Sequence, residues 1–161
     1  MSTSAFAGSS IRAEREWKRS APPTQLCSVS TKTSVGADRH RIFQALTVAE
    51  YIEAWFSVPG GVADHIHVFT REDFFSINIS STQRQHIGIL CSYKVCRRSK
   101  LLFTWAHNAL SETALSLVNI RLLGDFGRTT VQVTHSGLAP SDQPWHLELW
   151  QLSLAKLRKL F

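Results

Sequence analysis

The last twenty or so residues, from about Asp142 to Phe161, constrain the fold of this chain most. This stretch contains no Gly or Pro after Pro144, which predicts one uninterrupted helix. At about 100° of rotation per residue, its apolar side chains form two adjacent stripes that together cover very roughly 220°. The stripes are Leu147, Trp150, Leu154, Leu157 and Phe161, and beside them Trp145, Leu149, Leu152 and Leu160. A helix this apolar needs a surface that wraps it, and a curved sheet would do so.

Two polar residues, His146 and Ser153, lie seven apart in the middle of that apolar arc. Polar groups that face inward must find a hydrogen-bond partner or water. In one interpretation the sheet or the helix's own backbone satisfies each of them. In the other they face a cavity between helix and sheet, where they would orient a mostly apolar ligand. His135, from the last predicted strand, would add a third polar group, and both interpretations stay open on sequence alone.

The residues before this helix read as one strand, two short helices and a series of strands. A β-friendly run begins at Leu26 and ends near Gly36. Asp38 is the predicted N-cap of the first helix, and Thr47, with Glu50 three residues later, forms a predicted capping box for the second. Pro59-Gly60-Gly61 ends that helix. The further strands are predicted at 62–69, 74–80, 86–95, 101–107, 112–123 and 129–135, with Ile87, Ile89, Cys91, Tyr93 and Val95 sharing one face of the third.

This order predicts an α+β fold, with a curved antiparallel sheet of about six to seven strands gripping a long C-terminal helix. We expect one domain over residues 26–161, preceded by a mobile arm over residues 1–25, which is rich in Ser, Ala and Thr. No apolar run reaches the eighteen or so residues of a membrane span, and the N-terminus is a poor secretory signal. Three cysteines at no metal spacing indicate free thiols in a reduced compartment, hence a cytoplasmic location.

Charge and motifs exclude more functions than they support. The net charge of +6 indicates a solvated basic surface rather than nucleic-acid binding, since only Arg97, Arg98 and Lys100 form a tight cluster. His65 and His67 lack a third ligand, so no metal is expected. No Gly-rich phosphate loop, nucleophile elbow or paired carboxylates are present, so we expect no cofactor and assign no catalytic residue.

Four motifs in the right order resemble a known family. They are RIFQALTVAEYIEAWF (41–56), Gly88 with Tyr93-Lys94-Val95 and KLLFTW (100–105), TTVQVTHSG (129–137) and HLELW (146–150). Together these are similar to the START-like helix-grip (SRPBCC) superfamily, in the branch named after the activator of the heat-shock-protein-90 ATPase. The resemblance spans residues 26–161 and implies a curved sheet around a C-terminal helix with a cavity between them. Members include lipid carriers, hormone receptors, polyketide cyclases and chaperone partners, so the activity stays open.

Two departures from the family pattern bear on the cavity. The family commonly has a glycine before the last tryptophan, where this chain has Leu149. It also often has an Asp followed by a Gly-Gly pair near the second strand, where Glu72-Asp73-Phe74-Phe75 stands here. By volume these side chains would intrude, so we predict a smaller or more divided cavity than is typical.

The sequence therefore favours a non-catalytic protein, a monomer or homodimer, that binds a small apolar molecule such as a lipid. The residues expected to line its cavity are Trp55, Phe74, Phe103, Trp105, His135, His146, Leu149 and Ser153. The alternative is a chaperone-interacting module of the stress response, like the activator that names the branch. A third hypothesis is a cyclase- or hydrolase-type enzyme with His135 or His146 as general base, since histidine titrates near neutrality.

Overall fold

A computed structural model describes residues 25–60, 65–82, 86–108, 115–124 and 126–161. The predicted arm over residues 1–25 therefore falls almost wholly outside the described residues, as do the predicted strand starts at 62–64 and 112–114. In the described part of the chain, no helix is long and apolar enough to cross a membrane.

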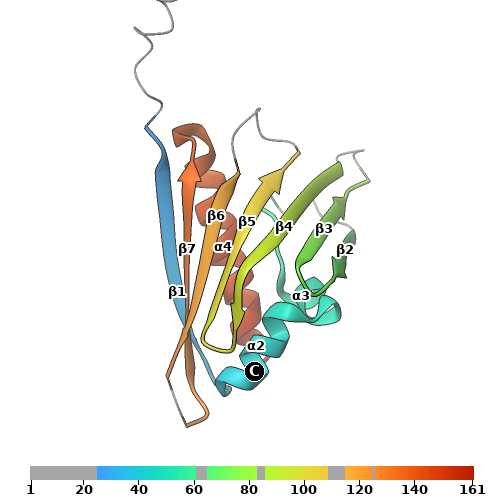
Figure 1. Cartoon of the computed structure of the whole chain (residues 1–161). Helices are drawn as coiled ribbons and strands as arrows, with labels where there is room; N and C mark the ends of the chain where they lie inside the picture. The colour runs from blue at the N-terminus through green and yellow to red at the C-terminus, as the bar shows by residue number, and fades with distance from the viewer. Residues whose placement is uncertain (1–24, 61–64, 83–85, 109–114, 125) are drawn as a thin grey trace, which may run out of the picture.

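The described strands form one antiparallel sheet with seven members in the order β1-β7-β6-β5-β4-β3-β2 (Figure 1). The last strand, β7, pairs with the first, β1, so β1 and β2 are the two edges of the sheet. The prediction of a curved antiparallel sheet with about six to seven strands is confirmed. The strands are β1 (Cys27–Val35), β2 (His65–Thr70), β3 (Phe74–Ser80), β4 (His86–Arg97), β5 (Lys100–His107), β6 (Ser116–Leu123) and β7 (Thr129–Leu138).

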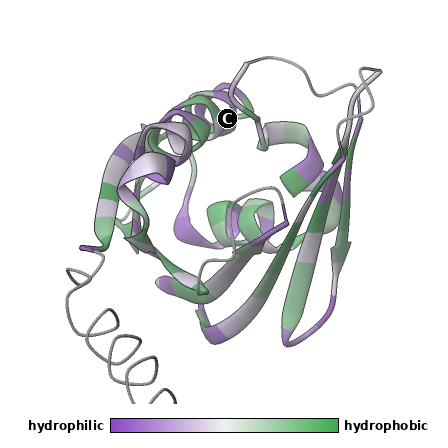
Figure 2. Cartoon of the chain, turned by 90° about the horizontal axis from the view of Figure 1, so that it is seen from above, coloured by the Kyte–Doolittle hydropathy of each residue, from purple (hydrophilic) through white to green (hydrophobic). Residues whose placement is uncertain are grey.

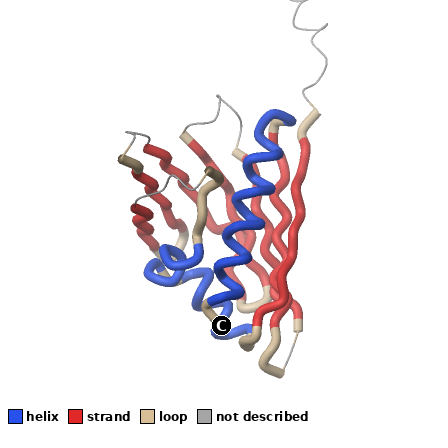
Figure 3. The backbone as a smooth tube through the Cα atoms, turned by 180° about the vertical axis from the view of Figure 1, so that it is seen from behind, coloured by secondary structure: helices blue, strands red, loops and turns tan. Residues whose placement is uncertain are grey.

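The long C-terminal helix α4 (Gln143–Lys159) follows a short 3₁₀ turn, η1 (Pro140–Asp142), and runs along the inner side of the sheet. Seen from above, the sheet bends around an interior that α4 closes on the remaining side (Figure 2). From behind, α4 crosses in front of the strands while α2 (Arg39–Thr47) and α3 (Ala49–Trp55) lie at its lower end (Figure 3). This arrangement is the predicted helix-grip fold.

The two short helices begin for different reasons. Asp38 caps α2 as predicted, because its Oδ1 accepts a hydrogen bond from the Arg41 N–H at 2.9 Å. The predicted capping box at Thr47 is wrong. Thr47 Oγ1 instead donates to the Phe43 carbonyl at 2.8 Å inside α2, and α3 starts after Val48 without a side-chain cap. The hydroxyl is satisfied within the first helix and is therefore not available to the second.

Alternating strand residues form the core, with one departure from the face predicted for β4. The inward side chains of β6 and β7, which include Val118, Ile120 and His135, are buried. In β4, an irregularity between Tyr93 and Val95 shifts the register, so Val95 pairs with the outward Leu102. The predicted common face from Ile87 to Val95 therefore ends at Tyr93, because a bulge adds one residue and reverses the alternation.

The buried face of α4 is narrower than its apolar arc. It consists of His146, Leu149, Trp150, Ser153, Leu154 and Leu157. Leu152, Leu160 and Phe161, which belong to the predicted stripes, are 40%, 46% and 37% exposed. An open sheet covers one side of the helix rather than most of its circumference. Both polar residues of the arc nevertheless point inward, as the sequence predicted.

Candidate functional site

The space between α4 and the sheet is almost filled by side chains. The cavity that remains has a volume of about 10 Å³, which is at the lower limit of what one water molecule needs. Its walls come from α2, α3, β3, β5, β6 and α4, so it lies at the centre of the fold. The lining residues are Leu46, Ile52, Trp55, Phe56, Phe75, Ile77, Phe103, Trp105, Ile120 and Trp150. This volume agrees with the prediction of a small cavity.

Three of the eight predicted lining residues line this cavity, whereas His135, His146 and Ser153 are buried but are not among its walls. Trp55, Phe103 and Trp105 form cavity walls, and Trp55 is fixed by a 2.7 Å hydrogen bond from its Nε1 to the Ala45 carbonyl. Leu149 is fully buried in α4 but is not among the cavity walls. Its side chain occupies core volume that a glycine would leave empty.

Phe74 corrects the sequence-based placement. The inward residues of β3 are Phe75, Ile77 and Ile79, and Phe75 lines the cavity. Phe74 belongs to the opposite face of the strand, where its ring centroid lies 6.1 Å from that of Phe69. Because successive strand residues alternate, only one of two adjacent phenylalanines can point inward, and the sequence did not show which.

A chain of hydrogen bonds fixes His135 beside the cavity. Trp150 Nε1–H donates to His135 Nδ1 at 3.1 Å, which leaves the proton of the neutral imidazole on Nε2. His135 Nε2 then donates to Ser116 Oγ at 2.8 Å, and Ser116 Oγ donates to the Trp105 carbonyl at 3.3 Å. Both nitrogens of His135 are therefore used by the protein itself. Sequence reasoning missed Ser116, because an isolated serine at the start of a strand carries no pattern.

His146 has the opposite arrangement. Its Nδ1–H donates to the Asp142 carbonyl at 2.8 Å, so the acceptor atom of the neutral ring is Nε2. Among the described residues, Nε2 has no hydrogen-bond partner although His146 is 0% exposed, and buried Trp105 Nε1–H also lacks one. The His146 ring lies 4.6 Å from the His135 ring and 6.1 Å from the Trp105 ring, centroid to centroid. His146 Nε2 and Trp105 Nε1–H are thus a buried acceptor and a buried donor in the same aromatic cluster.

The histidines of this cluster are held neutral. Burial, with a smaller effect of the His146 charge, lowers the pKa of His135 to about 3. Burial and then His146 lower the pKa of His107 to about 4, although Asp142 acts in the opposite direction. Burial also lowers the pKa of His146, against the hydrogen bond to the Asp142 backbone and the Asp142 charge. With both nitrogens engaged and so low a pKa, His135 is a poor general base.

Ser153 is satisfied by the segment that follows α3. Its Oγ accepts a hydrogen bond from the Ser57 N–H at 3.0 Å and donates to the Ser57 carbonyl at 3.3 Å. The protein itself therefore satisfies Ser153, although its partner is neither the sheet nor the backbone of α4 that the first interpretation named. For His146, that interpretation holds for Nδ1, which bonds the Asp142 carbonyl four residues earlier, and not for Nε2.

A second, larger hollow lies on the outer side of this segment. It has a volume of about 470 Å³ and is open to solvent. Its walls are mainly apolar, with one acidic and one basic side chain: Phe56, Ser57, Val58, Gly60, Ile66, Glu148, Leu152 and Lys156. We call it the α3–α4 groove. Phe56 lines both this groove and the interior cavity, so it lies between the two.

The interior of the fold, the order of its elements and the sequence motifs agree with one family. The model of the Activator of Hsp90 ATPase homolog 1-like proteins matches residues 36–161. The chain belongs to this family. It is an AHSA1-like helix-grip chain whose family match covers α2 to α4 and most of the sheet. A search of the curated proteins found no match.

Solved structures share this AHSA1-like fold at low sequence identity. A protein from Chromobacterium violaceum is similar with a TM-score of 0.70 at 15% identity, over 83% of this chain and 96% of that one. The AHSA1 protein from Silicibacter pomeroyi has a TM-score of 0.66 at 16% identity, over 83% and 96%. DynU16, described as a putative protein in the dynemicin biosynthetic locus, has a TM-score of 0.60 at 21% identity, over 82% of this chain but 46% of that one. These likenesses establish the fold.

Proposed function

We propose that this AHSA1-like chain is a non-catalytic binding protein that holds a small, mostly apolar ligand between the sheet and α4. The observation that carries the proposal is the position of Phe56, which is the shared wall of the interior cavity and the α3–α4 groove. The groove has the size of a small-molecule site, and the cavity behind the ring is lined by apolar and aromatic side chains. Displacement of one side chain would join them.

Because the interior is closed, a ligand can enter it only after a side chain has moved. A cavity of about 10 Å³ holds no organic molecule, so binding requires that Phe56 moves. Phe56 is the C-cap of α3: its N–H donates to the Ile52 carbonyl at 2.8 Å, and its own backbone conformation is extended, so the helix ends at this residue. The two hydrogen bonds between Ser57 and Ser153 hold the segment in place. Loss of these bonds is the expected step that opens the site.

The polar atoms left over in the interior define the ligand further. His146 Nε2 is an acceptor and Trp105 Nε1–H is a donor. A hydroxyl group can donate to the first and accept from the second. A carboxylate would offer only acceptors to a neutral histidine. We therefore propose a neutral ligand with an apolar body and one hydroxyl.

Native mass spectrometry of the full chain tests this proposal. A brominated long-chain alcohol and the matching bromoalkane would be added separately after gentle purification. The proposal predicts one alcohol per chain and weaker retention of the alkane. Equal retention of both would contradict the role of the hydroxyl, and no retention of either would contradict ligand binding. A co-purifying molecule would identify the natural ligand class directly.

Contact with a chaperone is the second candidate function, supported by the family description rather than by a surface of this chain. It predicts that the purified chain associates with heat-shock protein 90 and raises its ATPase rate. A pull-down and an ATPase assay with the ligand-filled and ligand-free chain would separate the two candidates. If the chain is only a ligand-binding protein, the ATPase rate of the chaperone should not change.

A further inference from the structure

One end of the molecule gathers three connections that are far apart in sequence. They are the β4–β5 turn, the β6–β7 turn and the link from β1 to α2, all at the lower end in Figure 1. Leu122 N–H donates to the Ser99 carbonyl at 2.9 Å, which joins the β4–β5 turn to β6. Thr129 Oγ1 donates to the Ala37 carbonyl at 2.8 Å, which joins the start of β7 to the link before α2. The three connections therefore form one continuous surface.

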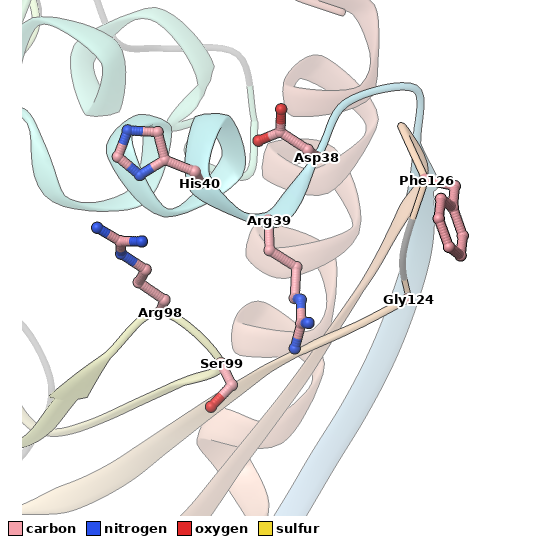
Figure 4. A pocket seen from close by; sticks show the side chains of 7 residues that line it. All are labelled: Asp38, Arg39, His40, Arg98, Ser99, Gly124 and Phe126. Carbon is pink, nitrogen blue, oxygen red and sulfur yellow. The ribbon is translucent and has the colours of Figure 1, made fainter.

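This surface is cationic. A pocket of about 480 Å³ opens between α2 and the two turns, and its walls include Arg39, His40 and Arg98. Figure 4 shows Arg39 and Arg98 extending into the space between α2 and the β4–β5 turn. The one carboxylate in the pocket wall, Asp38, accepts the N-cap hydrogen bond of α2. We call this surface the basic end, and its cationic residues are Arg39, Arg97, Arg98, Lys100, Arg121 and Arg128.

Several of these charges lie directly opposite one another on neighbouring strands. Arg97 pairs with Lys100 across β4 and β5, and Lys100 pairs with Arg121 across β5 and β6. Like charges at directly opposed positions destabilise a sheet. The described residues of β4 to β7 and of the turns between them contain no Asp or Glu, and Asp125 of the β6–β7 turn falls outside the described residues. These opposed like charges lower the stability of the isolated chain. An anionic partner that covers them would explain why they are present.

Exposed apolar side chains stand beside these charges. Phe126, at the tip of the β6–β7 turn, is 104% exposed, and Leu123, the last residue of β6 before that turn, is 41% exposed. Phe126 is among the residues that line the pocket, and Figure 4 shows its ring at the edge away from Arg98. Phe126 also has a φ of 58°, which is uncommon for a bulky residue and projects its ring from the tip. The ring has no packing role within the described chain.

We propose that the basic end docks on the surface of an anionic lipid bilayer, with Phe126 and Leu123 entering the interface and the surrounding arginines and lysine contacting headgroups. Clusters of four to eight cations are typical of attraction to anionic leaflets, and apolar side chains add to membrane affinity. Single-stranded nucleic acid would instead call for several aromatic rings along a groove. Here one ring and one leucine project from a turn.

Co-sedimentation of the full chain with lipid vesicles tests this surface. Vesicles of phosphatidylcholine alone are compared with vesicles in which roughly a third of the lipid is phosphatidylserine, at low and at physiological salt. The expected result is binding to the anionic vesicles alone, weakened by salt because the attraction is screened. Equal binding to both vesicle types, or none to either, would overturn the proposal. Binding to a single-stranded oligonucleotide without vesicle binding would overturn it too.

Variants assign the effect to the basic end. Arg98→Gln is expected to lower the partition coefficient onto anionic vesicles roughly fivefold, the typical effect of one cation near a charged leaflet. Arg71→Gln, which removes one exposed arginine from the β2–β3 turn, is the matched control and is expected to retain binding. Phe126→Asn suits the positive φ and is expected to lower binding roughly five- to tenfold. Equal losses for Arg98→Gln and Arg71→Gln would show that net charge, and not this surface, binds the vesicles.

Discussion

Ser153 of α4 and Ser57 of the segment after α3 hold each other through two hydrogen bonds. The Ser153 hydroxyl accepts from the Ser57 N–H at 3.0 Å and donates to the Ser57 carbonyl at 3.3 Å, and both residues are buried. This contact fixes the residue next to Phe56, which lines both the interior cavity and the α3–α4 groove. One serine on the helix therefore holds the wall of the proposed binding site in place.

Ser153→Ala should both destabilise the fold and ease entry to the interior. The substitution leaves the buried Ser57 N–H without a partner, which costs about 1–3 kcal/mol. Urea denaturation should show this loss, and uptake of a brominated alcohol should become faster. Ser28→Ala, at an exposed position of β1, is the control and should change neither quantity. Unchanged stability of Ser153→Ala would contradict the role given to this contact.

Stability should fall as the pH is lowered below about 6.5. His135 and His107 have folded-state pKa values lowered to about 3 and about 4, so the unfolded chain binds more protons between those values and 6.5. Their contribution is complete above 6.5 and is lost as the pH falls toward 4. Each such histidine contributes a slope of up to about 1.4 kcal/mol per pH unit. Denaturation midpoints measured between pH 7 and pH 4 check the direction.

His135→Gln should reduce this pH dependence, because it removes one group that protonates only on unfolding. His86→Gln, at an exposed position, should keep the slope of the original chain. If both variants showed the same slope as the original chain, the buried histidines would not be the source of the acid sensitivity.

Leu149→Ala should enlarge the interior. Leu149 is fully buried, so its truncation should cost about 2–5 kcal/mol and leave a cavity next to the central one. Leu152→Ala, at a position that is 40% exposed, should cost less than half as much. If the interior is the binding site, Leu149→Ala should also retain bulkier alcohols than the original chain in native mass spectrometry. Retention limited to the original sizes would place the ligand elsewhere.

Phe75→Ala and Phe74→Ala are a matched pair that tests the register of β3. Phe75 is buried and lines the cavity, so its loss should cost about 3–5 kcal/mol. Phe74 is partly exposed beside Phe69 on the other face, and its loss should cost clearly less. Thermal denaturation of both variants decides the order, and equal losses would mean that both rings are in the core.

The order of elements and the grip of the sheet on α4 were predictable because each rests on a periodic pattern. Val131, Val133 and His135 alternate, and Asp38 stands where a helix must begin. The family resemblance implied the same curved sheet around the helix and added a cavity between them. Patterns of this kind depend on many residues, so a single irregular position does not remove them.

Details that depend on one residue were not predictable. The choice between Phe74 and Phe75, the bulge after Tyr93 and the use of Thr47 within α2 each follow from local geometry that sequence spacing does not encode. The two polar partners of His135, Ser116 and Trp150, come from β6 and α4, so no short sequence window contains them.

Quenching of tryptophan fluorescence by the brominated long-chain alcohol tests the central claim most directly. In a Trp17→Phe background the signal comes from Trp55, Trp105, Trp145 and Trp150, and three of these line the cavity. The account predicts saturable quenching at one alcohol per chain, and a large loss of it in Ile120→Phe, which fills the cavity from β6. Quenching that rises linearly without saturation, or that is the same in Ile120→Phe, would contradict binding between the sheet and α4.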